Sequence, residues 1–133
     1  MHDNTLIIES LEQSEQVIEN LIEGTANILD IHELPKSADG MLRLNGICMS
    51  FIVIGEEVKR IDRYTEKQLL PQYSGISWKS VMGMRDRIAH GYFEIDLEII
   101  FDTLKNDMPQ LLSVIKQMKT DIQTFLDNTC KIH

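Results

Sequence analysis

The sequence predicts an all-α fold: a single domain, spanning residues 1–133, built as a bundle of about five helices. Apolar residues recur at helical spacing along most of the 133 residues, and proline and glycine divide the chain into segments of helix length. No internal repeat, low-complexity stretch or domain linker is visible. A chain of this length can bury roughly two-thirds of the surface that its unfolded form exposes. We therefore expect one hydrophobic core inside a helical bundle.

The first helix is predicted from about residue 5 to about residue 30, with Gly24 as a point of interruption. Its apolar positions repeat at intervals of 3, 4 and 7 residues: Leu11, Ile18, Leu21 and Ile22. Glutamates occupy the other faces, which is typical of an amphipathic helix. The polar stretch HELPKSADG contains Pro35 and Gly40 and predicts the connection to the second helix.

The second helix is the most apolar segment of the chain. Its periodic positions are Leu44, Ile47, Cys48, Phe51, Val58 and Ile61. Its middle, ICMSFIVIG, resembles a buried strand, but the period continues for about twenty residues, which favours a helix. Because the segment is apolar on nearly all sides, we expect it either at the centre of the bundle or in a subunit interface.

The remaining helices are bounded by caps and breakers. The stretch LLPQYSGIS reads as a loop, after which Ser77 is expected to N-cap a helix that runs to about His90 and ends with Gly91 as its C′ residue. Asp96 is predicted to cap the next helix, and Asp107 to cap the last one, with Pro109 in its first turn. The last helix is expected to bury the following residues: Leu111, Leu112, Ile115, Met118, Ile122, Phe125 and Leu126.

Composition indicates a folded cytoplasmic protein. Hydrophobic residues make up 43% of the chain and charged residues 26%, close to an average globular protein. No stretch approaches the roughly 20 apolar residues of a membrane span, and the N-terminus lacks the features of a secretion signal. Cys48 and Cys130 are the two cysteines, and their positions indicate neither a disulfide framework nor a zinc site.

The charge is unevenly distributed. The net charge of −8 argues against a protein that coats nucleic acid indiscriminately. Residues 1–35 hold eight acids and no lysine or arginine, whereas residues 59–87 hold seven bases against three acids. A local anion site on an acidic body fits this pattern, and so do ordinary solvated helix faces. The acidic first helix is compatible with repelling RNA, docking a basic partner or keeping the chain soluble.

The stretch MRDRIAHGYF, residues 84–93, concentrates the residues suited to chemistry. At about 100° per residue, Arg85 and Tyr92 share a helix face, Asp86 and His90 share another, and Arg85 and His90 diverge by about 140°. One helix therefore does not clamp a phosphate between Arg85 and His90. Either the helix unwinds at Gly91, or two copies of the segment face each other across a dimer axis. A simpler reading is a helix end with a dipole-stabilising histidine and an i,i+4 pair.

Two longer segments, RLNGICMSFIVIGEEVKR and ISWKSVMGMRDRIAHGYFEIDLEIIFDTLKNDMPQL, resemble the HepT-like group of the HEPN superfamily. The resemblance covers about residues 4–125. The signature of that group is an arginine, four residues, a histidine, one residue and a tyrosine, which Arg85, His90 and Tyr92 match, and Asp86 fits the polar residue that commonly follows the arginine. The resemblance implies the toxin half of a HEPN/MNT toxin–antitoxin module, a homodimer whose two motif segments line one cleft, and endoribonuclease activity without a metal or cofactor.

The residues suit this chemistry. Cleaving RNA without a metal needs a base for the 2′-hydroxyl, an acid for the leaving 5′-oxygen and positive charge on the phosphorane-like transition state. Histidine, with a reference pKa near 6.5, can serve as base or acid, and a two-fold dimer supplies two copies each of His90 and Arg85. We therefore expect Arg85 to bind phosphate, His90 to transfer protons and Asp86 to orient one of them. The absence of clustered carboxylates favours a mechanism without a divalent metal.

The tyrosine of the motif has a separate role by resemblance. The partner antitoxin of such modules is a minimal nucleotidyltransferase, which would transfer adenylate from ATP to Tyr92 and so block the RNA cleft. Two other functions remain open: a non-catalytic HEPN-type module that presents substrate to, or scaffolds, a nucleotidyltransferase, and an all-α adaptor without an RNA role. The sequence leaves open whether messenger or transfer RNA would be cut.

Overall fold

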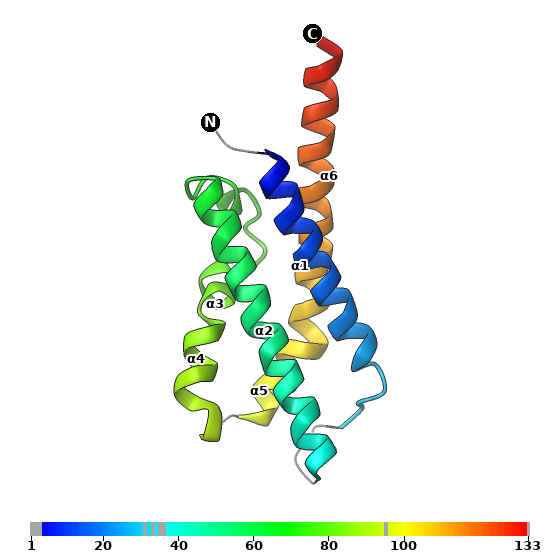
Figure 1. Ribbon diagram of the computed structural model, residues 1–133, viewed down its shortest axis with the longest axis vertical. Coiled ribbons are helices and arrows are strands. Elements are labelled where there is room, and N and C mark those ends of the chain that lie inside the picture. The colour runs from blue at the N-terminus through cyan, green and yellow to red at the C-terminus, as the bar shows by residue number, and fades with distance from the viewer. Residues whose placement is uncertain (1–3, 31, 33, 35–36, 95, 133) are drawn as a thin grey trace.

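The fold is an elongated bundle of helices (Figure 1). The computed structural model describes residues 4–30, 32, 34, 37–94 and 96–132, without the side chains of residues 92 and 128–132. Its α-helices are α1 (Asn4–Gly24), α2 (Ala38–Tyr64), α3 (Trp78–Met82), α4 (Met84–Gly91), α5 (Leu97–Asp102) and α6 (Met108–Ile132). These described residues contain no strand. The expected all-α bundle of about five helices is confirmed, because α3 and α4 are two halves of one expected helix.

The three long helices form the body of the bundle. α1 packs against both α2 and α6, whereas α3 and α4 pack along α2 (Figure 1). The core is built from apolar residues at helical spacing, and Phe51, Ile54 and Val58 of α2 are buried within it. By length and composition alone, α2 could also cross a membrane. This corrects the sequence expectation that no stretch of the chain is apolar enough to do so. A core helix passes that test too, and we assign α2 as one because α1, α3 and α4 pack on it.

α1 ends earlier than its sequence pattern predicts. It stops at Gly24 rather than near residue 30, so the expected interruption is the end of the helix. The hydroxyl of Thr25 donates to the main-chain oxygen of Leu21 at 2.7 Å, and Lys105 Nζ donates to the main-chain oxygen of Thr25 at 2.8 Å. Both oxygens also accept a backbone N–H, from Thr25 and Ile28 respectively, so the side-chain bonds add to the turn in which the helix ends.

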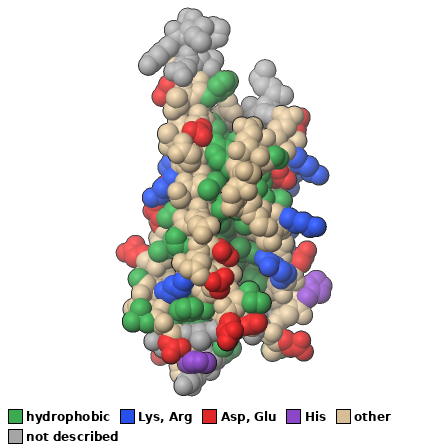
Figure 2. Space-filling view, turned by 180° about the vertical axis from the view of Figure 1, so that it is seen from behind, with side chains coloured by type: hydrophobic (Ala, Val, Ile, Leu, Met, Phe, Trp, Pro, Cys, Tyr) green, Lys and Arg blue, Asp and Glu red, His purple; other side chains and the backbone are tan. Residues whose placement is uncertain are grey.

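Part of the acidic charge of α1 is paired with lysines of α6. Lys119 of α6 pairs with Glu15 at 2.6 Å, and Lys116 pairs with Glu19 at 3.2 Å. The hydrogen bond to Glu15 raises the pKa of Lys119. The face in Figure 2 shows basic and acidic side chains interspersed, with acidic ones gathered toward its lower end. The glutamates of α1 therefore contribute to the α1–α6 contact.

The expected helix from Ser77 to His90 is divided at Gly83. Ser77 occupies the N-cap position, but its hydroxyl donates to the Ser80 hydroxyl at 2.9 Å instead of capping a backbone N–H. Arg87 Nη2 donates a hydrogen bond to the main-chain oxygen of Ser80 at 2.6 Å. Gly83 itself is a weak helix former. The expectation that Gly91 is a C′ residue is also wrong: Gly91 is the last residue of α4, and no described glycine has a positive φ.

The C-terminal helices contain one confirmed cap and one wrong prediction. Asp96 caps α5 by accepting from the N–H groups of Glu98 and Ile99. Asp107 caps nothing, because a π-helical turn, Thr103–Asp107, joins α5 to α6. Pro109 has no N–H to donate to the preceding turn. The wider π-helical turn precedes it and accommodates this missing donor. In this turn the N–H of Met108 donates to the Thr103 carbonyl.

The last helix buries fewer of its predicted positions than its pattern indicates. Leu111, Ile115 and Met118 are buried as expected, whereas Phe125 is 63% exposed. The other three predicted positions, Leu112, Ile122 and Leu126, are partly buried. α6 extends beyond the ends of its neighbours (Figure 1), so its distal residues have no core to enter.

Candidate active site

The helix that carries the motif, α4, is fixed by close contact with α2. A Cβ atom added at Gly55 of α2 would lie 2.7 Å from the main-chain oxygen of Val81, in α3, and 3.7 Å from Met84 Cβ, in α4, so glycine allows both helices to approach α2. Met84 and Ile88 of α4 are buried on the inner side. Because these two anchor the inner face, Arg85 and His90 are left exposed on the outer surface.

Arg85 lies beside an acidic residue of α2. Its Nη1 is 3.6 Å from Glu56 Oε1, and the Arg85 side chain remains 61% exposed. Glu56 also pairs with Lys59, at 3.5 Å. Exposed ion pairs of this kind stabilise a fold weakly. The contact therefore orients the guanidinium and leaves much of it accessible to a phosphate.

The imidazole of His90 is held by the main chain. Its Nδ1 lies 2.8 Å from the carbonyl oxygen of Asp86. A carbonyl only accepts, so Nδ1 carries the hydrogen and Nε2 is the nitrogen left for proton exchange. The ring thus meets the Asp86 main chain, whereas the simpler sequence reading placed an i,i+4 charge pair here.

A single subunit does not bring Arg85 and His90 together. α4 remains helical through Gly91, so the two side chains keep the divergence of about 140° that helix geometry imposes. The unwinding at Gly91 considered from the sequence does not occur, because Gly91 is the last residue of α4. Tyr92 begins a 3₁₀ turn, Tyr92–Glu94, at the end of α4, and its side chain lies outside the described part of the structure.

An exposed apolar stripe runs along α2 toward this site. Leu42 is 68% exposed, Met49 59% and Val53 36%. Glu56, the partner of Arg85, follows Val53 by three residues and so lies on the same face one turn further. Sequence reasoning left the surroundings of α2 open between core and interface; the structure shows that one face is core and this one is not.

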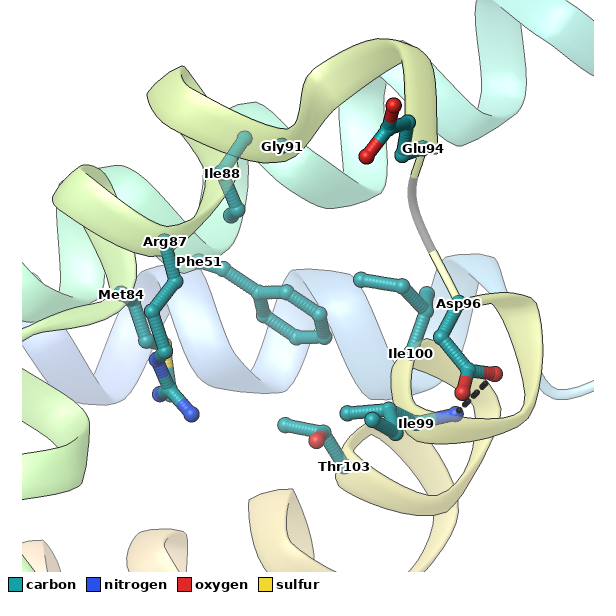
Figure 3. A pocket seen from close by; sticks show the side chains of 10 residues that line it. All are labelled: Phe51, Met84, Arg87, Ile88, Gly91, Glu94, Asp96, Ile99, Ile100 and Thr103. Atoms are coloured by element: carbon teal, nitrogen blue, oxygen red, sulfur yellow. Dashed lines mark hydrogen bonds between the residues drawn. The ribbon is translucent and has the colours of Figure 1, made fainter.

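A cavity of about 220 Å³ lies behind α4, where the helix faces α5 (Figure 3). Phe51, Ile88 and Ile100 contribute apolar walls, and Arg87 and Glu94 stand at its edge. Gly91 also lines it. Within the described residues, no group of three or more histidine, cysteine, aspartate or glutamate side chains is placed to hold a metal ion.

Sequence reasoning missed several features beside the motif. These are Glu56, Arg87, the α2 stripe and Phe93, which is 97% exposed. Only Phe93 carried a sequence signal, as an aromatic residue next to the motif. The pairing of Glu56 with Arg85 joins residues 29 positions apart, and helical periodicity does not reveal such a contact.

This α-helical bundle, in which α4 carries Arg85 and His90, is a HEPN-type domain. The chain belongs to the HepT-like family, described as "Ribonuclease HepT-like", which matches residues 7–118. A "putative RNase" of Caldanaerobacter subterraneus is 33% identical over 69 residues, covering 52% of this chain and 58% of that protein. No solved structure matches this chain.

Two archaeal proteins are similar over comparable lengths. A "putative RNase" of Methanocaldococcus jannaschii is 32% identical over 77 residues, 58% of this chain and 60% of the relative. A "probable ribonuclease HepT" of Thermococcus cleftensis is 33% identical over 67 residues, 50% of this chain and 57% of the relative. The chain thus spans somewhat more than half the length of these curated relatives.

Proposed function

We propose that this protein is the toxin component of a HEPN/MNT toxin–antitoxin module, a cytoplasmic, metal-independent endoribonuclease. Membership of the HepT-like family and the names of its relatives support ribonuclease activity. The observation that carries the proposal is the exposed pair Arg85 and His90 on α4. The two diverge on one helix, so they serve one phosphate only when a second copy completes the site.

The α2 stripe supports a homodimer that closes beside the motif. Met49 and Val53 expose apolar area that a second copy would cover. This face leads to Glu56 and hence to Arg85. A two-fold axis near this end of α2 would place the two α4 helices on either side of one cleft.

In such a cleft, protein side chains alone can supply the groups needed to cleave RNA. One His90 takes the proton of the RNA 2′-hydroxyl, whose oxygen attacks the adjacent phosphorus. The His90 of the other subunit protonates the departing 5′-oxygen. The two Arg85 guanidinium groups bind the phosphate and stabilise the charge of the transition state. Asp86 supports the site by holding the His90 ring through its carbonyl oxygen, and no metal or cofactor takes part.

Regulation of the toxin is assigned to Tyr92. The phenolic oxygen attacks the α-phosphate of ATP in the active site of an MNT-type nucleotidyltransferase, the antitoxin; an O–P bond forms and pyrophosphate leaves. Incubation with that enzyme and ATP should add one or more adenylate groups to the wild-type chain and none to Tyr92→Phe, as measured by mass spectrometry. Adenylate on another residue would contradict the assignment.

Expression of the chain alone in bacteria tests the ribonuclease. The wild type should arrest growth and degrade cellular RNA, and Arg85→Ala and His90→Ala should each restore growth. Matched controls are Arg43→Ala and His32→Ala, which change exposed residues on other elements and should remain toxic. Equal toxicity of the wild type and both motif variants would overturn the catalytic proposal. RNA binding without cleavage would favour the non-catalytic module.

A further inference from the structure

A groove separates α4 from α5 on the back of the motif helix. The cavity of about 220 Å³ behind α4 adjoins a second hollow of about 340 Å³, which extends past α3 to the start of α6. The two hollows share four lining residues: Met84, Arg87, Ile99 and Thr103. Figure 3 shows open space between Arg87 on the α4 side and Ile99 and Thr103 on the α5 side. We call this depression, which the four shared residues mark, the α4–α5 groove.

The groove lies away from the motif arginine. Met84, Arg87, Ile88 and Gly91 of α4 line it, and at about 100° per residue these four positions share one face of the helix. Arg85 diverges from Arg87 by about 160° on the same helix. The homodimer proposed above closes beside Arg85, so it leaves the groove open for another molecule.

The groove has an exposed apolar side chain above a buried floor. Ile99 on α5 is 59% exposed, whereas Phe51 and Ile88, which also line the cavity, are buried. A single exposed isoleucine needs no explanation on its own. Here it borders a cavity, and an apolar side chain placed in a pocket is the usual centre of a protein interface. The groove can therefore take an apolar side chain of a partner, which would cover Ile99.

The rim of the groove is acidic. Four carboxylates line it: Glu94, Asp96, Asp102 and Asp107. In the described part of the chain, none of the four forms an ion pair. Arg87 is the one base among the described lining residues, and its Nη2 already donates to the main-chain oxygen of Ser80. The groove therefore has an excess of negative charge that no lysine or arginine of the described chain neutralises.

This charge decides which class of molecule fits the groove. RNA and anionic lipids present phosphates, which four carboxylates repel. A second copy of this chain carries a net charge of −8 and is disfavoured for the same reason. A protein segment rich in lysine and arginine is attracted by these carboxylates. The shape agrees, because α4 alone is about 12 Å long at about 1.5 Å per residue and the groove continues along α3, which suits several residues of a chain.

We propose that the α4–α5 groove docks a basic, amphipathic segment of a partner protein. One apolar side chain of the segment enters the cavity and covers Ile99, and its lysines or arginines face the carboxylates of the rim, Asp102 and Asp107 among them. This inference does not depend on the proposed ribonuclease activity, because neither Arg85 nor His90 takes part in the docking.

Calorimetric titration of the full-length chain tests the docking. The probe is a synthetic amphipathic helix with leucines on one face and lysines on the other, which should bind the wild type. Ile99→Ser should weaken this binding about tenfold, because the apolar area that the probe covers is lost. The double variant Asp102→Asn/Asp107→Asn should weaken it by roughly 2- to 30-fold. All three residues are exposed, so these variants should keep the fold.

A charge-matched control separates docking from general attraction to an acidic protein. Glu9→Gln/Glu23→Gln removes two exposed carboxylates of α1, which do not line the groove, and should bind the probe as tightly as the wild type. A probe with glutamates in place of the lysines should not bind. No binding of the lysine probe to the wild type, or equal weakening in the two double variants, would overturn the proposal.

Nuclear magnetic resonance locates the probe on the wild type. The lysine probe should shift the amide resonances of Ile88, Ile99 and Thr103 and leave those of α1 unchanged. Shifts confined to the α2 stripe would place the probe on another surface and contradict the proposal. A monomeric Ile99→Ser in sedimentation velocity would contradict it as well, because a second copy of the chain would then cover the groove.

Discussion

The His90 side chain bonds to the main chain of Asp86 and not to its carboxylate. Substituting the two residues should therefore affect RNA cleavage to different extents. Because the ring bonds to the Asp86 carbonyl oxygen, Asp86→Ala keeps the contact. We expect Asp86→Ala to lower single-turnover RNA cleavage by less than about tenfold, and His90→Ala by about 10²- to 10⁴-fold, the usual contribution of a general acid or base. Equal losses in the two variants would show that the Asp86 carboxylate itself takes part.

Tyr73 and Asp121 connect the loop before α3 to α6. The Tyr73 hydroxyl donates to Asp121 Oδ2 at 2.5 Å. Burial and this carboxylate raise the pKa of Tyr73 to about 12, and the hydrogen bonds from Tyr73 and Gln117 lower the pKa of Asp121. The tyrosine is thus stabilising below its unfolded pKa of about 10, and the aspartate above its unfolded pKa of about 3.9.

This pair predicts a pH dependence of stability. The urea midpoint of the wild type should fall as pH rises from about 10 to about 12, and should also fall as pH decreases below the unfolded pKa of Asp121. Tyr73→Phe should have a lower midpoint at neutral pH and shallower declines in both ranges. Identical pH profiles for the wild type and Tyr73→Phe would show that the hydrogen bond contributes nothing to folding.

The close packing of α3 on α2 depends on a glycine of α2, Gly55. At Gly55 a Cβ atom would lie 2.7 Å from the Val81 carbonyl oxygen, whereas at Gly46 of the same helix it would meet nothing within 4 Å. Gly55→Ala should therefore lower the free energy of unfolding by about 1–3 kcal/mol, and Gly46→Ala should raise it by up to about 1 kcal/mol. Chemical denaturation measures both, and a neutral Gly55→Ala would contradict the close packing of α3 on α2.

Helix existence could be predicted from the sequence, and helix boundaries less well. The apolar period of α2 identified it as a helix despite its strand-like middle, and Asp96 was found because its cap is local in sequence. The turn after α1 is contacted by Lys105, 80 residues from Thr25, and Arg87 reaches back across the break at Gly83 to Ser80. Such contacts arise only when elements pack, so the local pattern does not contain them.

The candidate site likewise has one part that could be predicted from the sequence and one part that depends on tertiary packing. The spacing of Arg85, His90 and Tyr92 along one helix is a sequence property and gave the motif directly. The pairing of Arg85 with Glu56 and the exposed face of α2 depend on which side of α2 packs against α1 and α4. A nearly uniform apolar pattern leaves that side undetermined.

At the scale of the whole molecule, the α2 stripe predicts how subunits associate. Met49→Glu would place two carboxylates in the interface, and we expect it to weaken the homodimer on the order of 100-fold, as measured by sedimentation velocity across a dilution series. Leu29→Glu, at an 80% exposed residue outside α2, is the matched control and should dimerise normally. RNA cleavage should fall with the dimer fraction. A fully dimeric, active Met49→Glu would exclude this face.

If two subunits close one site from Arg85 and His90, the two α4 helices face each other across the dimer axis, and the distance between them can be measured. Spin labels at Ala89→Cys, in a Cys130→Ser background with Cys48 buried, report that distance by pulsed electron resonance. Facing motif helices predict a separation within about 20 Å, two helix diameters. A separation near 40 Å, the length of α2 at about 1.5 Å per residue, or no dipolar coupling at all, would show that the two subunits do not share a site.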